Sequence, residues 1–158
     1  MRFLFVDKID AYSADQIAGR RAFAADEPMR YLSAPGRAGP VVAPGALSEA
    51  IGQLASWLCL ERNGFTARPV FLFADRITVE APVAVGKVVD LAVTIEGLDQ
   101  ETFRFTGEAR VEGRVVQRIQ ACSCYFMPLA ELEDPAESRR RFAALAQGGL
   151  TYDGVGGE

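Results

Sequence analysis

The sequence predicts an α+β fold in which an antiparallel sheet wraps around one long central helix. Two observations carry this prediction. Residues 45–62 form a segment of helical length with almost no charge, and the chain beyond it alternates apolar and polar residues with the period of two that is typical of strands. With 158 residues, 49% of them apolar, the chain is long enough for one well-buried core and too short for two.

The chain before the helix is predicted to form two strands and a long loop. The strands cover residues 3–11, which are rich in aromatic and branched side chains, and residues 16–24, which alternate less cleanly. Residues 26–44 then carry so many prolines and glycines that no regular structure is expected there. An ordered loop of this length is usually functional.

The central helix has clear start and stop signals. Pro44 suits the first helical position, and Asn63 and Gly64 end the segment as helix stops do. The segment is apolar nearly all round, so burial on most sides is expected. Gly52 lowers helix stability, and we expect close approach by a neighbouring backbone to explain its presence.

Four strands are predicted after the helix, arranged as a meander. Glu112 and Gly113 supply a tight hairpin turn between the last two. The four strands cover residues 70–79, 88–96, 102–111 and 115–126.

The C-terminal part is predicted to be a helix that begins at Asp134 and Pro135 and frays after Gly148. We therefore expect a main domain of residues 1–130. Residues 131–158 are expected to form a C-terminal helix and a flexible tail.

Composition excludes several classes of partner. The chain has 17 basic and 21 acidic residues and no long basic run, so nucleic acid is not expected to bind. The apolar run at the N-terminus meets Asp7 and Lys8 too early for a signal peptide or a membrane span. We expect a cytoplasmic protein with no membrane partner.

The three cysteines are expected to be reduced and packed. Their number is odd, and Cys122 and Cys124 are spaced to lie on one face of a strand, while Cys59 belongs to the helix. The chain has no histidine and no second cysteine pair to complete a tetrahedral set of ligands. A metal site is therefore not expected.

Glu49 is a lone carboxylate near the start of an otherwise almost uncharged helix. Because the chain contains no histidine, it lacks the commonest side chain for proton transfer near neutral pH. Any acid–base chemistry must use other groups, and Glu49 is the first candidate.

Three stretches of the chain match a known pattern. They are Phe-Leu-Phe-Val-Asp-Lys-Ile at residues 3–9, Glu-Pro at residues 27–28, and Pro-Val-Val-Ala-Pro-Gly-Ala-Leu-Ser-Glu-Ala-Ile-Gly-Gln at residues 40–53. The most specific part is the Glu-Ala-x-x-Gln element formed by Glu49, Ala50 and Gln53. Over residues 3–126 the chain resembles the hot-dog fold, and within it the 3-hydroxyacyl acyl-carrier-protein dehydratases.

This resemblance implies a homodimer in which two sheets join into one, with a tunnel for an acyl thioester at the interface. The thioester would be carried by acyl carrier protein or coenzyme A, in fatty-acid or polyketide-like metabolism, and no cofactor is implied. Trp57, Phe71 and Phe73 then either pack the core or line the tunnel.

The chain departs from the family pattern in its loop. The family carries His-Phe-Pro-Gly there, but the matching position falls near Ser33 when the Pro-Gly pair is aligned, or on Pro35 when counted back from the helix. Neither residue is a histidine. Gly45 also lies four residues before Glu49, whereas the family places this glycine five residues before the carboxylate.

The resemblance also implies roles for individual residues. In the family, histidine removes the proton alpha to the thioester carbonyl and the helix carboxylate helps to expel the 3-hydroxyl group as water, which makes Glu49 a catalytic residue. Gln53, one turn later on the same side, contacts Glu49, contacts the thioester carbonyl, or bridges to the loop. Gly45 offers its backbone N–H to the carbonyl oxygen or is a turn glycine. Tyr31 and Ser33 are the polar side chains that could replace part of the missing base.

Three functions remain open on the sequence. The leading interpretation is a dehydratase-like protein that acts on or binds 3-hydroxyacyl thioesters. A non-catalytic module that binds acyl chains or a carrier protein fits the missing histidine directly. A hot-dog thioesterase would instead use Glu49 to orient or activate water.

Overall fold

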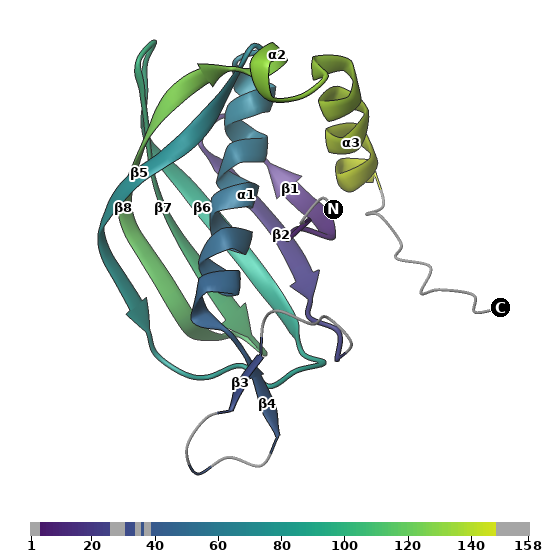
Figure 1. Cartoon of the computed structure of the whole chain (residues 1–158), viewed down its shortest axis with the longest axis vertical. Coiled ribbons are helices and arrows are strands. Elements are labelled where there is room, and N and C mark those ends of the chain that lie inside the picture. The colour runs from purple at the N-terminus through teal and green to yellow at the C-terminus, as the bar shows by residue number, and fades with distance from the viewer. Residues whose placement is uncertain (1–3, 26–30, 34–35, 37–38, 148–158) are drawn as a thin grey trace, which may run out of the picture.

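The computed structural model describes residues 4–25, 31–33, 36 and 39–147. Its main sheet has six antiparallel strands in the order β1-β2-β6-β7-β8-β5, and a separate two-stranded sheet pairs β3 with β4 (Figure 1). The elements in chain order are β1 (Lys8–Tyr12), β2 (Gln16–Ala22), β3 (Tyr31–Ser33), β4 (Pro40–Val42), α1 (Pro44–Arg62), β5 (Ala67–Val79), β6 (Val88–Leu98), β7 (Thr102–Val111), β8 (Arg114–Pro128), α2 (Leu129–Leu132) and α3 (Pro135–Gln147).

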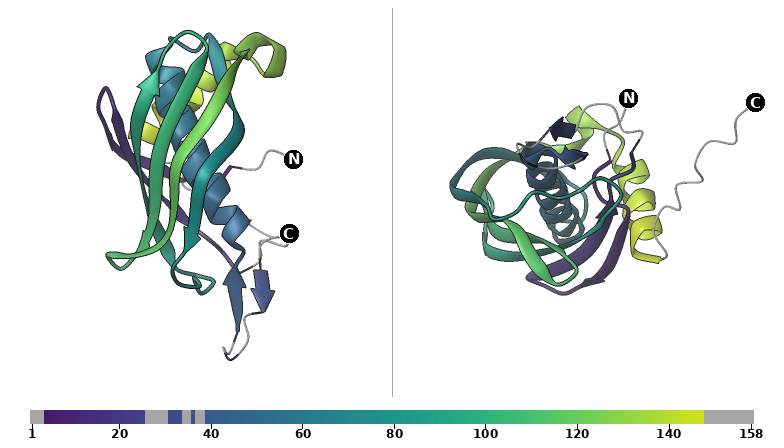
Figure 2. Two further views of the ribbon diagram at one scale, coloured as in Figure 1. Left: turned by 90° about the vertical axis from the view of Figure 1, so that its left-hand side faces the viewer. Right: turned by 90° about the horizontal axis from the view of Figure 1, so that it is seen from below.

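The main sheet curves around α1, which lies along its concave face and contacts five of its strands (Figures 1 and 2). The face of α1 toward the sheet is fully buried, with Leu54 and Leu58 each 0% exposed. Burying leucine side chains of this kind contributes about 1.5–3 kcal/mol each. The predicted arrangement, an antiparallel sheet around one long helix, is confirmed.

Two strand glycines allow α1 to lie close to the sheet. A Cβ atom added to Gly107 on β7 would lie 2.4 Å from Cγ2 of Ile51. One added to Gly19 on β2 would lie 3.1 Å from Cδ1 of Leu54 and also 2.5 Å from the Lys8 carbonyl oxygen of β1. Gly52 of α1 was expected to show the same kind of contact, and this expectation is wrong. Apart from the adjoining residues and backbone of α1 itself, no atom lies within 4 Å of a Cβ added there, because Gly52 faces the pocket described below.

The expected meander of four strands is also wrong in one respect. Strand β5 pairs with β8 at the edge of the sheet, and β6 lies between β2 and β7. Residues 80–87 connect the edge strand β5 to β6 in the middle of the sheet. Within this connection Val83 is 2% exposed, and Ala84 forms an isolated β-bridge with Val41. The alternating pattern marks each strand but does not encode its neighbour. The hairpin predicted at Glu112 and Gly113 is present, with both residues at positive φ.

The N-terminal half differs from the prediction at two places. Strand β1 begins at Lys8 rather than at residue 3, which lies outside the described residues. The loop predicted without regular structure contains β3 and β4, which pair with each other beside the start of α1 (Figure 1). Each has three residues, too few to show an alternating pattern, and Pro40 lies at the first position of its strand, where proline is tolerated.

Helix α3 begins at Pro135, as predicted, while the predicted fraying after Gly148 lies outside the described residues. The ring of Phe142 packs against the rings of Tyr12, Trp57 and Phe65, with centroid distances of 5.2, 6.3 and 5.9 Å. The C-terminal helix therefore shares the core of the sheet and α1. No helix within the described ranges is long and apolar enough to cross a membrane.

Candidate functional site

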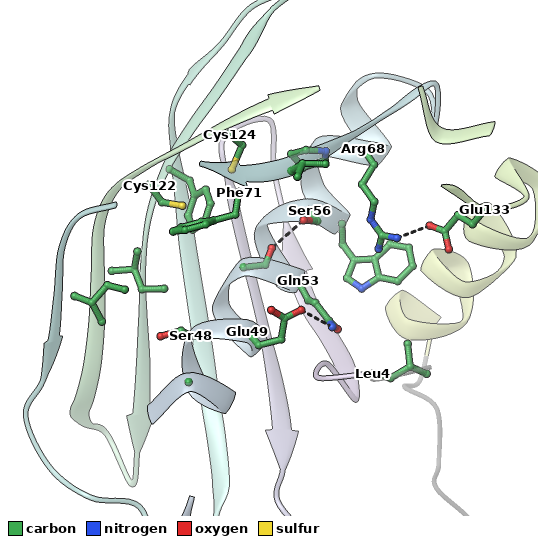
Figure 3. Close-up of a pocket in the computed structure, with 18 of the residues that line it drawn as sticks. Leu4, Ser48, Glu49, Gln53, Ser56, Arg68, Phe71, Cys122, Cys124 and Glu133 are labelled. Atoms are coloured by element: carbon green, nitrogen blue, oxygen red, sulfur yellow. Dashed lines mark hydrogen bonds and ion pairs between the residues drawn. The ribbon is translucent and has the colours of Figure 1, made fainter. Parts of the chain in front are cut away.

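A pocket of about 730 Å³ runs along α1 (Figure 3). One wall is a polar strip on α1, a second wall is apolar and comes from strands β5, β7 and β8, and one end carries charged residues from β5 and the C-terminal part. The polar strip comprises Gly45, Ser48, Glu49, Gly52, Gln53 and Ser56; the apolar wall includes Val70, Phe71, Ile77, Phe105, Ile119, Cys122 and Cys124; the charged end comprises Arg68, Glu133 and Arg141.

The polar strip follows from helix geometry. Its members are spaced three or four residues apart, so they share one face of α1 while the apolar residues between them face the sheet. The structure thus brings together Gly45, Glu49 and Gln53, three of the five predicted site residues. Tyr31 and Ser33 form part of β3, and because the structure does not describe their side chains, the roles expected for them remain predictions.

Glu49 is held in place by Gln53. The Gln53 Nε2 atom donates a hydrogen bond of 3.0 Å to Glu49 Oε1, and the Gln53 Oε1 atom accepts one of 2.8 Å from the backbone N–H of Phe5. The contact with Glu49 that was considered for Gln53 is therefore present, and the same side chain also binds the N-terminal segment, while its expected bridge to the loop remains a prediction. The amide orients the carboxylate, and the N-terminal segment orients the amide.

Gly45 lies at the start of α1, one turn before Glu49. The helix has no side-chain cap at Ala43, and no acceptor for the Gly45 N–H is found among the described residues. The first amides of a helix carry partial positive charge, so this N–H suits an oxygen atom that gains negative charge.

Gln117 is a site residue that the sequence analysis missed. It lies on β8 and is 0% exposed, and its Nε2 atom donates to the Pro44 carbonyl oxygen at 3.1 Å and to Ser48 Oγ at 2.6 Å. The sequence held one signal for this residue: Gln117 is a long polar side chain in a strand segment between Val116 and Ile119, both of which are buried.

The apolar wall contains two of the three cysteines, and all three are free thiols, as predicted. Burial raises the pKa of Cys59 to about 12. The hydrogen bond between Cys122 and Cys124 raises the pKa of Cys122 and lowers the pKa of Cys124. Within the described residues, no group of three or more acidic or cysteine side chains could hold a metal ion.

The aromatic residues divide between the two roles considered for them. Trp57 is 5% exposed, so it belongs to the core, and it also lines the pocket. Phe71 lines the pocket but is 57% exposed in the single chain. Phe73, at 54% exposed, lies outside both the core and this pocket, because a bulge between Phe71 and Phe73 interrupts the alternation of β5.

The charged end of the pocket joins β5 to the C-terminal part. Arg68 Nη1 and Glu133 Oε1 form an ion pair of 2.9 Å (Figure 3). Arg141 pairs with Glu137 one turn earlier on α3. Each guanidinium group has five N–H donors in a planar fork, an arrangement suited to phosphate or carboxylate oxygens.

Comparison with protein-family models and with curated proteins finds no match. Solved structures do match. One is the dehydratase heterocomplex ApeI:P from Xenorhabdus doucetiae, with a TM-score of 0.63 and 15% identity over 82% of this chain and 86% of that chain. Another is smu.793 from Streptococcus mutans UA159 bound to acetyl CoA, with a TM-score of 0.62 and 9% identity over 81% of this chain and 94% of that chain. A third is a hypothetical thioesterase with coenzyme A from Streptococcus pneumoniae TIGR4, with a TM-score of 0.59 and 12% identity over 77% of this chain and 88% of that chain.

The chain has the hot-dog fold. The fold expected from the resemblance is confirmed, and α1 is its central helix. In this hot-dog fold the pocket lies between the central helix and the strands at the β5 edge of the sheet. At identities of 9 to 15% these comparisons establish the fold, and the chemistry must be argued from the pocket itself.

Proposed function

We propose that this protein hydrolyses acyl thioesters of coenzyme A or acyl carrier protein, with Glu49 as the base that activates water. One observation carries the proposal: Glu49 is the single carboxylate on the polar strip, and Gln53 donates a hydrogen bond to it. Hydrolysis of a thioester needs one base for water and one group that stabilises the oxyanion.

Each step has a group on the pocket wall. Glu49 accepts a proton from water, and the water oxygen attacks the thioester carbonyl carbon. The Gly45 N–H, at the positive end of α1, stabilises the oxyanion that forms. The carbon–sulfur bond then breaks, and the thiol leaves with the proton that Glu49 held. The apolar wall of β5, β7 and β8 holds the acyl chain.

Dehydration of a 3-hydroxyacyl thioester is the second candidate, favoured by the Glu-Ala-x-x-Gln element at residues 49–53. Elimination needs a base for the alpha proton and an acid for the hydroxyl group, which the related dehydratases divide between histidine and the carboxylate. This chain has no histidine, so Glu49 would have to serve both steps. Hydrolysis needs one proton-transfer side chain and one oxyanion donor, for which Glu49 and the Gly45 N–H line the pocket, and it therefore fits the pocket better.

The same site is proposed to be completed in a homodimer. Strand β5 is an edge strand whose Phe71, Leu72, Phe73, Ile77 and Val79 side chains are 48 to 57% exposed. An exposed apolar edge strand of this length favours pairing with another strand. Because Phe71 and Ile77 also line the pocket, a second copy paired along β5 would cover its open side.

The experiment is incubation of the purified protein with acyl and 3-hydroxyacyl thioesters of coenzyme A and of acyl carrier protein, followed by mass spectrometry. Release of free thiol from both substrate types is the expected result. Loss of water from the 3-hydroxyacyl substrates alone would establish the dehydratase. Bound thioester that is never converted would establish a binding module.

A further inference from the structure

The hydroxyl group of Ser48 has a fixed hydrogen-bonding role that follows from its neighbours. Ser48 lies on the polar strip beside Glu49, and its Oγ atom is 2.6 Å from Gln117 Nε2. A serine hydroxyl can donate one hydrogen bond and accept two, so the identity of the Gln117 atom that it meets decides the direction of this bond.

The Pro44 carbonyl settles the orientation of the Gln117 amide. A carbonyl oxygen only accepts hydrogen bonds, and the Pro44 oxygen lies 3.1 Å from the same Gln117 nitrogen. Turning the amide over would place two oxygen atoms against each other. The observed orientation is kept although it leaves Gln117 Oε1 buried without a partner within the described part of the chain. Gln117 therefore donates one hydrogen to Pro44 and one to Ser48.

Ser48 must then accept from Gln117, and its own proton is directed elsewhere. Serine in a helix commonly donates to the carbonyl oxygen four residues earlier. Ser56 does so, with its Oγ atom 3.0 Å from the Gly52 oxygen. For Ser48 the equivalent acceptor is the Pro44 oxygen, but this oxygen accepts from Gln117, and within the described residues Ser48 Oγ donates neither to it nor to any other acceptor. The free donor lies on the pocket wall.

We infer that the Ser48 hydroxyl donates a hydrogen bond to the carbonyl oxygen of the bound thioester, and that Gln117 is the positioning residue that directs it. This inference rests on the proposed function. Ser48 lies three residues after Gly45, so the Ser48 O–H and the Gly45 N–H share one helix face and form a two-donor site for one oxygen. Glu49 points away from Ser48 and toward Gln53 (Figure 3), so a thioester carbon placed between the two would have the proton acceptor on one side and the hydroxyl donor on the other.

The test uses the carbonyl stretching frequency of a bound thioester, measured by isotope-edited infrared spectroscopy with an acyl-coenzyme A labelled with ¹³C at the carbonyl. A hydrogen bond to the carbonyl oxygen lowers this frequency. Ser48→Ala is expected to raise the frequency of the bound thioester and to lower kcat on the order of 10²-fold, the usual cost of losing one oxyanion donor. Ser48→Thr retains the hydroxyl and is expected to keep the frequency low.

Two further variants separate the role of the donor from a structural effect. Gln117→Leu frees the Pro44 carbonyl, so Ser48 should donate to it as Ser56 donates to Gly52, and the frequency should rise although Ser48 is intact. Ser138→Ala removes a buried hydroxyl on α3, outside the pocket lining, and should leave the frequency unchanged.

The outcomes distinguish this inference from the proposed function. A bound thioester whose frequency is the same in wild type and Ser48→Ala would overturn the role of Ser48 and leave the hydrolase proposal in place. Failure of the wild type to bind any of the thioesters would overturn both.

Discussion

Gln53 links Glu49 to the N-terminal segment through one side chain, with 3.0 Å between Gln53 Nε2 and Glu49 Oε1 and 2.8 Å between Gln53 Oε1 and Phe5 N. The nitrogen and the oxygen of this amide therefore have different roles. One fixes the carboxylate that we assign to catalysis, and the other anchors the amide to the backbone.

Replacing Gln53 with Met, which has a similar length, removes both hydrogen bonds. We expect thioester hydrolysis to fall in kcat by about 10- to 100-fold, because Glu49 loses its orientation, with little change in KM. The free energy of unfolding should fall by about 1 kcal/mol through the loss of the bond to Phe5. Steady-state kinetics and urea denaturation measure the two effects. An unchanged kcat would show that Gln53 does not position Glu49 for catalysis.

Gly52→Ala should separate stability from function. Alanine is about 1 kcal/mol more favourable than glycine within a helix, and no atom lies within 4 Å of the added Cβ. The variant should therefore unfold at higher temperature. The same methyl group projects into the pocket between Glu49 and Ser56, so KM should rise, most of all for bulky acyl groups. Calorimetry and kinetics on one preparation test both effects, and a more stable variant with unchanged KM would show that the substrate lies elsewhere.

Phe73→Lys tests the proposed homodimer. Phe73 is 54% exposed and lies outside the pocket lining, so a charge there should disturb pairing along β5 while leaving the single chain folded. Sedimentation should give twice the chain mass of 17.1 kDa for the wild type and the single mass for the variant. Val88→Lys, at an apolar position of similar exposure on β6, is the matched control and should stay dimeric. A monomeric wild type would contradict the proposal.

The pocket thiols should differ in reactivity. The thiolate is the reactive form, and the hydrogen bond from Cys122 lowers the pKa of Cys124, so Cys124 should begin to react at a lower pH than an ordinary cysteine. Burial holds the pKa of Cys59 at about 12, so Cys59 should stay unreactive near neutral pH. Iodoacetamide labelling across a pH series, followed by peptide mapping, measures the order. Bound acyl-coenzyme A should slow labelling of Cys124. An equal labelling rate with and without acyl-coenzyme A would place the acyl chain outside the pocket.

Arg68→Ala tests the charged end of the pocket. Arginine binds phosphate through its planar fork, and we expect this end to hold the phosphate of a coenzyme A or carrier-protein thioester. The variant should raise KM for acyl-coenzyme A about 10-fold and leave KM unchanged for the N-acetylcysteamine thioester, which lacks phosphate. Arg104→Ala removes a surface guanidinium paired with Asp75 and should change neither value. Equal effects of Arg68→Ala on both substrates would contradict a phosphate site.

The sequence predicted the central helix, most of the strands and the shared side of Glu49 and Gln53 on α1, because helical spacing alone places these two residues one turn apart. It did not predict the contact between Ser48 and Gln117, which are 69 residues apart in the chain. That contact depends on how β8 lies against α1, and no local pattern encodes it.

The errors have the same origin. The pairing of β5 with β8, and the bulge that turns Phe73 to the surface, are set by contacts between distant strands rather than by alternation within one strand. The pairing of Arg68 with Glu133 likewise joins residues 65 positions apart. Local periodicity therefore identified most of the elements and the shared side of Glu49 and Gln53 on α1, while the rest of the polar strip, the opposite wall and the charged end of the pocket required the tertiary structure.

The most direct test of the account is the rate of thiol release from acyl-coenzyme A by the wild type and by Glu49→Gln, with Glu61→Gln, a change of the same kind elsewhere on α1, as control. The amide keeps the size of the side chain but cannot accept the proton from water. We predict a loss in kcat on the order of 10²- to 10⁴-fold for Glu49→Gln and no change for Glu61→Gln. Equal rates for Glu49→Gln and the wild type would contradict the central claim that Glu49 activates water.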